Sequence, residues 1–240
     1  MKNLVSIILP TRKRFDVLLK SVKSLYDKAT QQEHIELLLR FDEDDVESIR
    51  RVSELDNITK NYKYVIGDRL DGYYSLDVFV RELCEISTGE FLLLWNDDAL
   101  MMSSGWDDYV SLYLGETCCI QMGNNHFPYI FPIISRDIFE VLGHFGGFPS
   151  DTWIHDVCKS LGVEIIEESI YAIHDRADVT GNNNDETYVE SMNSGRLAGN
   201  RLLVDTTQIK DTAKEYYAEE TQKLVKQDIE KLKAYLEYKQ

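Results

Sequence analysis

Short apolar runs alternate with amphipathic helical segments through the first hundred residues, and this alternation strongly constrains the fold. The apolar runs predict strands at residues 4–9, 35–41, 62–66 and 91–95. A helical stripe follows the first strand, and a second helix is predicted at 74–87, with Gly89 as its C-cap. Strands that alternate with helices at this interval indicate βαβ units. The chain is therefore predicted to be an α/β protein with a mainly parallel sheet flanked by helices.

The second half of the chain is less regular. Its candidate strands are residues 118–122, 130–135, 163–166 and 170–174, and its candidate helices are 136–142 and 152–161. After about Thr206, Lys and Glu dominate, and one apolar stripe on a long helix is formed by Val225, Ile229, Leu232 and Leu236. We therefore predict a domain over 1–205 and an amphipathic helical extension over 206–240. The stripe either docks on this domain or mediates assembly, for example of a homo-oligomer.

Composition narrows the classes of function. A chain of 240 residues with 43% hydrophobic residues can bury a full core, and its formal charge of −16 disfavours binding to nucleic acid or to an anionic membrane. No apolar run approaches the ~20 residues of a membrane span, and the first run is too short for a signal peptide. The four cysteines lack metal-type spacing, which favours free thiols in a reducing compartment. A cytoplasmic location is expected.

Residues that could bind a ligand or act in catalysis lie at the ends of several of the predicted strands. They are Pro10, Thr11, Arg12 and Arg14 after the first strand, Asp42 after the second, and Asn96, Asp97 and Asp98 after the fourth. Asp151 begins a later helix. Each group alone could be a turn or a helix N-cap. Because parallel strands end at one edge of a sheet, where α/β proteins bind ligands, we expect these groups to converge there.

The sequence resembles the nucleotide-sugar glycosyltransferases of the GT-A (Rossmann-like) fold, most closely family 2. Residues 5–11 look like that family's first strand and nucleotide loop, and 36–42 are similar to its second strand. Residues 89–98 resemble its block of Gly, Glu, apolar strand and Asp-x-Asp. Residues 150–153, followed by Leu161 and Gly162, are similar to the helix that carries its catalytic base. The resemblance covers roughly residues 4–175.

The resemblance implies a hexosyltransferase-type enzyme that moves a sugar from a nucleotide-sugar donor to a glycan or other hydroxyl acceptor. Asp42 would hold the base, and the remaining strand-end residues would hold the donor. Asp98 would bind Mn²⁺ or Mg²⁺, with His174 as a second ligand of metal or phosphate. The cation would stabilise the diphosphate leaving group as a Lewis acid. Asp151 would act as the base of an inverting transfer.

Three positions depart from the family pattern. Asn96 replaces the first Asp of Asp-x-Asp, Ser150 replaces a Glu, and the double Asp after the second strand is Phe41-Asp42. These departures leave two alternatives open on the same fold. One is a nucleotidyltransferase, although the loop at 10–14 lacks the glycines typical of that class. The other is a non-catalytic protein that binds a nucleotide sugar.

Overall fold

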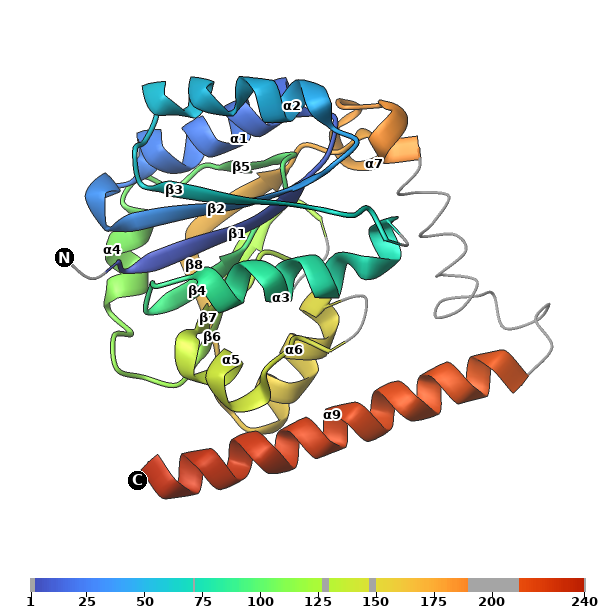
Figure 1. Cartoon of the computed structure of the whole chain (residues 1–240). Coiled ribbons are helices and arrows are strands. Elements are labelled where there is room, and N and C mark those ends of the chain that lie inside the picture. Colours follow the sequence, from blue (N-terminus) through green and yellow to red (C-terminus); the bar gives the residue numbers. More distant parts are fainter. Residues whose placement is uncertain (1–2, 71, 127–129, 147–149, 190–211, 240) are drawn as a thin grey trace.

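The structure is a computed structural model that describes residues 3–70, 72–126, 130–146, 150–189 and 212–239. Among these residues, eight strands form one sheet in the order β3-β2-β1-β4-β7-β6-β8-β5 (Figure 1). The strands are β1 (Val5–Thr11), β2 (Ile35–Asp42), β3 (Tyr62–Gly67), β4 (Phe91–Leu94), β5 (Ala99–Met101), β6 (Cys119–Asn124), β7 (Ile133–Ser135) and β8 (Glu164–His174).

Strand direction divides the sheet into two halves. β3, β2, β1 and β4 are parallel neighbours, so their carboxyl ends lie at one edge. β7 is antiparallel to both β4 and β6, β6 is parallel to β8, and β5 is antiparallel to β8. The predicted α/β sheet is confirmed, and it is mixed in the half built from the second part of the chain.

The described helices cover both faces of the sheet. They are α1 (Phe15–Lys28), α2 (Val46–Arg51), α3 (Leu76–Ile86), α4 (Trp106–Ser111), α5 (Arg136–Leu142), α6 (Ser150–Ser160), α7 (Ala177–Thr180) and α9 (Thr212–Lys239), with short 3-10 turns η1 (Gln32–His34), η2 (Val52–Asn57) and η3 (Gly72–Ser75).

The alternating side chains of β1 show how the two layers arise. Ile7 and Leu9 are fully buried in the apolar cluster that contains the α1 stripe, whereas Ile8 is buried in a second cluster with α3, α5 and α6. Successive residues of a strand point to opposite faces, so a continuous apolar strand needs cover on both sides. The apolar run near the N-terminus therefore dictates a central strand.

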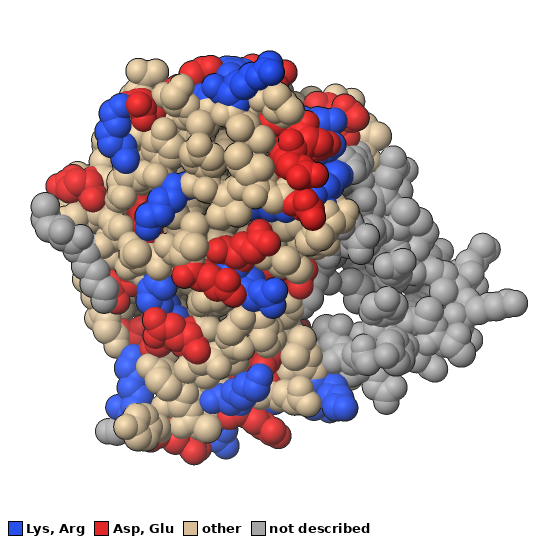
Figure 2. All heavy atoms as spheres, in the orientation of Figure 1, with Lys and Arg blue, Asp and Glu red and all other residues tan. Residues whose placement is uncertain are grey.

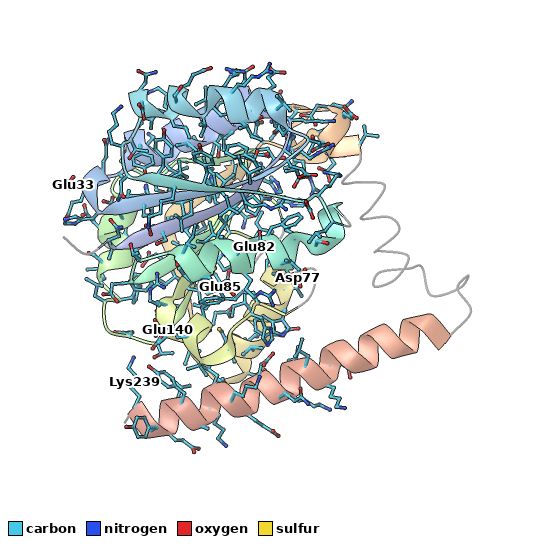
Figure 3. The ribbon with its side chains drawn as sticks, in the orientation of Figure 1. Glu33, Asp77, Glu82, Glu85, Glu140 and Lys239 are labelled. Carbon is cyan, nitrogen blue, oxygen red and sulfur yellow. The ribbon has the colours of Figure 1, made fainter. Side chains whose placement is uncertain are left out.

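Helix α9 packs along α5 and α6 (Figure 1). Leu232 is fully buried in the second cluster, and Val225, Ile229 and Leu236 pack against it. Near the end of the helix, the ammonium of Lys239 lies 3.0 Å from a carboxylate oxygen of Asp137 (Figure 3). The apolar stripe thus docks on its own chain, the first of the two expected alternatives.

The expected C-cap at Gly89 is wrong. Helix α3 ends at Ile86, and Ser87 caps it in an extended conformation. A Cβ at Gly89 would lie 2.6 Å from the backbone nitrogen of Ser6, and the Gly89 nitrogen donates to the Ser6 hydroxyl at 2.8 Å. The glycine is needed for close approach of two backbones, which hydrophobic periodicity does not reveal.

The two strands expected at 163–166 and 170–174 are one strand, β8. The polar residues Glu167, Glu168 and Ser169 looked like a break. The strand continues through them, with a register shift in its pairing to β6 between Met122 and Gly123. An irregularity of this kind takes up the extra residues without ending the strand.

Three further observations concern the chain's surface and thiols. All four cysteines are free and buried, as expected. Acidic and basic side chains are interspersed over the face shown in Figure 2. Within the described part of the chain, no helix combines the length and the apolar character that crossing a membrane requires.

Candidate active site

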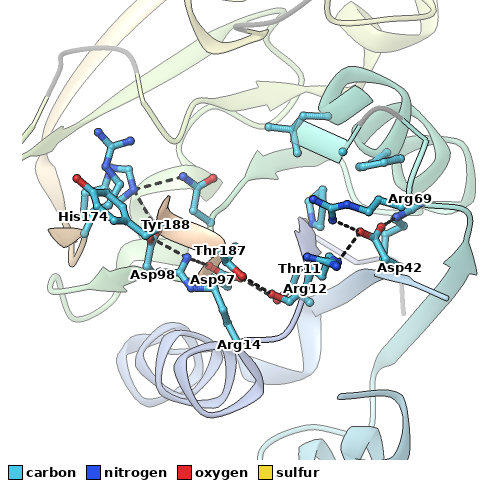
Figure 4. A pocket seen from close by; sticks show the side chains of 17 residues that line it. Thr11, Arg12, Arg14, Asp42, Arg69, Asp97, Asp98, His174, Thr187 and Tyr188 are labelled. Carbon is cyan, nitrogen blue, oxygen red and sulfur yellow. Dashed lines mark hydrogen bonds and ion pairs between the residues drawn. The ribbon is translucent and has the colours of Figure 1, made fainter. Parts of the chain in front are cut away.

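A cavity lies at the carboxyl edge of the parallel strands (Figure 4). Asp42 and Arg69 lie at one end of it, Asp98 and His174 at the other, and Arg14 between them. The predicted residues that line this cavity are Pro10, Thr11, Arg12, Arg14, Asp42, Asn96, Asp97, Asp98 and His174. The fold therefore brings together side chains from the ends of β1, β2 and β8 and from the loops after β1 and β4.

The loop after β1 turns Arg14 into this cavity. Lys13 has a left-handed backbone with φ of 56°, an uncommon conformation for a residue with a side chain. The carboxylate of Asp45 stabilises the turn, because it accepts from the Lys13 nitrogen at 2.6 Å and from the Ser48 nitrogen at 3.2 Å. Arg14 consequently begins α1 with a buried side chain.

Arg14 is surrounded by three carboxylates. Its Nη1 lies 2.8 Å from Asp97 Oδ1 and 3.1 Å from Asp98 Oδ2, and its Nε lies 2.8 Å from Asp185 Oδ2. Burial opposes the charge of Arg14, but the three carboxylates outweigh it and raise its pKa. One positive and three negative charges sum to −2 when all are ionised. This end of the cavity therefore favours an additional cation.

The two adjacent aspartates differ in their surroundings. Burial raises the pKa of Asp97 to about 6, although Arg14 and the hydroxyl of Thr11 favour its ionised form. Burial also opposes ionisation of Asp98, but the hydrogen bond and charge of His174, together with Arg14, prevail and lower its pKa. Asp98 is thus the carboxylate that stays ionised most readily.

Asp98 and His174 fit a divalent cation. His174 Nε2 lies 3.1 Å from Asp98 Oδ1. Cis ligands of an octahedral cation bound at about 2.1 Å stand about 3.0 Å apart, so both atoms could bind one ion with little movement. Asp97 is a poorer ligand, because burial raises its pKa whereas the pKa of Asp98 is lowered.

The described residues contain no cluster of three or more His, Cys, Asp or Glu that could hold a metal. Two protein ligands are nevertheless typical of Mg²⁺ that also binds substrate phosphates and water. Asn125 holds the His174 backbone in place, because its Oδ1 accepts from the His174 nitrogen at 2.8 Å. The donor set therefore suits a cation that arrives with a diphosphate.

At the other end of the cavity, Asp42 is held by arginines. It pairs with Arg40 of the same strand, with Arg69 at 2.8 Å, and with Arg12 at 3.4 Å. The Arg40 guanidinium carbon lies 3.6 Å from the centre of the Phe79 ring, a cation–π contact. This end combines an aromatic face with planar donors and one carboxylate, groups that can stack on and hydrogen-bond to a heterocyclic base.

Asp151 is not among the residues that line the cavity. It lies in the first turn of α6, where its Oδ1 accepts from the Thr152 nitrogen at 2.8 Å. Burial raises its pKa, and the charge of His174 acts on it in the opposite direction. Asp151 is therefore close enough to the acidic end to interact with it electrostatically. Residues 147–149, which precede it, lie outside the described residues.

Several cavity residues were not predicted. They are Arg40, Arg69, Gly72, Leu76, Phe79, Arg176, Thr187 and Tyr188, and Asp185 stands beside them on Arg14. Arg40 lies within an apolar strand, where one buried charge is an available signal. Arg69 and Arg176 each lie two residues beyond a strand, after Gly67 of β3 and His174 of β8, which is a further available signal. The polar sequence at 181–185 gives no comparable signal for Thr187 and Tyr188.

A parallel half sheet, a mixed second half and an acidic cavity at the strand ends define a GT-A type of architecture. No protein-family model and no curated protein matches the sequence. Solved structures do match. The mannosyltransferase PcManGT from Pyrobaculum calidifontis, in complex with GDP-Man and Mn²⁺, superposes with a TM-score of 0.56 and 15% identity. The match covers 72% of this chain and 57% of that one, so this chain spans little more than half of the mannosyltransferase.

TarS from S. aureus gives a similar match. Its residues 1–349 in complex with UDP superpose with a TM-score of 0.57 and 13% identity over 84% of this chain and 75% of that one. The complex with UDP-GlcNAc gives 0.57 and 12% over 79% and 64%. At this level of identity, the likeness establishes the fold: this chain has the fold of GT-A glycosyltransferases.

Proposed function

We propose that this protein is a glycosyltransferase that moves a sugar from a nucleoside-diphosphate donor to a hydroxyl acceptor. The observation that carries the proposal is the cavity itself. It joins an arginine–aromatic end around Asp42 to an acidic end around Asp98 and His174, at the strand edge where α/β folds bind nucleotides. The structural neighbours described above were solved with GDP-Man and Mn²⁺, UDP or UDP-GlcNAc, which supports a donor of this class.

The residues suggest a direction for the bound donor. The base would lie at the end of the cavity lined by Asp42, Arg69 and Phe79, and the diphosphate would extend past Thr11 toward Arg14. Arg14 offers planar donors that suit phosphate oxygens. The sugar would then lie near His174 and Asp98, at the far end of the cavity.

A divalent cation would be held by Asp98 and His174. When bound, it would supply Lewis-acid stabilisation of the charge that develops on the departing diphosphate. The net charge of −2 around Arg14 supports this assignment, because an anionic donor would otherwise enter a site that already holds excess negative charge.

Asp151 would accept the proton of the attacking hydroxyl, which makes the transfer an inverting one. Its raised pKa supports this role, because a base is more effective when its pKa approaches the working pH. Its position at the start of α6, electrostatically coupled to His174, is consistent with an acceptor bound on the α6 side of the cavity.

The test is nucleotide binding with and without Mn²⁺, followed by release of free nucleotide from UDP- and GDP-sugars. We expect Asp98→Asn to abolish the Mn²⁺-dependent part of binding and turnover, while Asp27→Asn, an exposed aspartate of α1, changes neither. If the Asp98→Asn variant binds nucleotide with its full dependence on Mn²⁺, the metal assignment is refuted. Tight binding without any sugar release from a panel of donors would favour a non-catalytic binding protein.

A further inference from the structure

Residues 182–189, here called the strap, run beside the cavity from a contact with Asp175 to a contact with the loop after β1. Thr187 and Tyr188 of the strap line the cavity. The Thr187 hydroxyl donates to the Arg12 carbonyl at 3.2 Å, and the Asn182 amide donates to Asp175 Oδ1 at 2.7 Å. Since Asp175 directly follows His174, the strap is anchored beside the proposed metal ligands.

The central tie of the strap is Asp185. Its Oδ2 accepts from Arg14 Nε at 2.8 Å, and its Oδ1 accepts from the Tyr188 nitrogen at 2.8 Å, which caps a helical turn at 186–189. Asp185 thereby binds the Nε side of the Arg14 guanidinium, whereas Asp97 and Asp98 bind its Nη1. A phosphate oxygen that bound Arg14 would accept from the same guanidinium N–H groups as Asp185.

Of the three carboxylates on Arg14, Asp185 is the one that can leave. Its side chain is 36% exposed, against 9% for Asp97 and 6% for Asp98. The other two are held from several sides, by Thr11 and by His174. Departure of Asp185 would return one carboxylate to water, and would reduce the negative charge that faces an incoming anion.

We propose that Asp185 is an internal substitute for the donor's diphosphate. With no donor bound, it holds the strap beside the cavity; when a diphosphate binds Arg14, it is displaced and the strap is released. This inference rests on the proposed function for the identity of the anion. A protein whose binding-competent state is populated to a fraction f binds with an apparent Kd larger by 1/f. The strap therefore tunes donor affinity.

The test compares wild type with Asp185→Asn and Glu186→Gln. The first substitution keeps a good N-cap residue but removes the charge that pairs with Arg14. The second makes the same charge change one residue away, at an exposed position. Binding of UDP, GDP and inorganic pyrophosphate, each with Mn²⁺, is measured by calorimetry, and hydrogen exchange of residues 182–189 is followed with and without each anion.

We expect Asp185→Asn to bind the anions about tenfold more tightly than wild type and Glu186→Gln to match wild type. Anion binding should accelerate exchange of the strap in wild type. Equal or weaker binding by Asp185→Asn, or a strap whose exchange slows or stays constant on binding, would overturn the inference while leaving the donor site intact. If only pyrophosphate binds, and more tightly to Asp185→Asn, the strap mechanism stands and the nucleotide-sugar function fails. If no anion binds any variant, both fail.

Discussion

Arg14 is the residue on which the acidic end of the cavity depends. It is buried, and it lies within hydrogen-bonding distance of two buried carboxylates whose negative charges repel each other. A buried charge whose partner is removed costs far more than the pair contributes when intact. The guanidinium is therefore a structural requirement of this site, in addition to its proposed role as a hydrogen-bond donor to phosphate.

We expect Arg14→Ala to lower the free energy of unfolding by about 3–5 kcal/mol, because Asp97 and Asp98 would be left uncompensated. Arg81→Ala is the control. Arg81 pairs with Glu85 on α3, their side chains are 48% and 63% exposed, and exposed pairs contribute about 1 kcal/mol or less. Urea denaturation of both variants measures the difference. Equal losses would show that Asp97 and Asp98 do not need Arg14.

Asp151 gives a prediction about pH. A base works in its ionised form, so turnover should fall as pH drops through its pKa, which burial raises above the ordinary value for aspartate. The acidic limb of the rate profile should therefore lie at higher pH than for an exposed carboxylate. Asp151→Asn should lose this limb and about 10²–10⁴ in turnover, with nucleotide affinity unchanged.

The control for that experiment is Asp156→Asn, an exposed aspartate on the same helix. Its rate profile should match that of wild type. If Asp151→Asn retains both normal turnover and the acidic limb, then Asp151 is a helix-capping residue and the base lies elsewhere.

At the scale of elements, a substitution in helix α9 can show whether this helix contributes to the stability of the folded domain. Leu232 is fully buried among residues of α5 and α6. Leu232→Ala should cost about 2–5 kcal/mol in unfolding free energy, as for other buried leucines. Tyr238→Ala, at a position 90% exposed, should change it little. Light scattering should show the same mass for all three proteins; a drop in mass for Leu232→Ala would indicate that the helix also mediates assembly.

The sequence predicts those elements whose pattern is local. The strand β4 was found because its run Phe91–Leu94 is uninterrupted and apolar, a pattern typical of buried strands. β5 was missed because three residues are too few to show any periodicity. β8 was divided because pairing across the sheet, and not local pattern, carries the strand through three polar residues.

The same reasoning explains what was found in the site. Residues at and directly after the ends of parallel strands converge by topology alone, so eight of the cavity residues could be predicted from strand ends, whereas His174 was implied by the family resemblance. Asp185 and Tyr188 follow no such strand. They reach the cavity because a turn anchored on Asp175 directs the chain back beside it, and that path depends on tertiary hydrogen bonds. Local sequence carries no signal for contacts of this kind.

For the whole molecule, ligand binding and stability should be linked. Any ligand that binds the folded state alone stabilises it, by about 2.7 kcal/mol at 100 times its Kd. We expect at least one of UDP, GDP, CDP and dTDP to raise the melting temperature, and Mn²⁺ to increase the shift. The matching nucleoside, which lacks the diphosphate, is the control and should give a smaller shift. Equal shifts for nucleoside and nucleotide would show that the diphosphate contributes nothing to the binding free energy.

The tie between Arg14 and Asp185 joins residues 171 positions apart in the chain. During synthesis, the loop after β1 and the acidic pair after β4 leave the ribosome long before the strap does. For that interval, a nascent chain presents Arg14 to solutes without its third carboxylate. The contact with Asp185 can therefore form only after residues 182–189 have been made, and any product terminated before β8 would present Arg14 without this carboxylate.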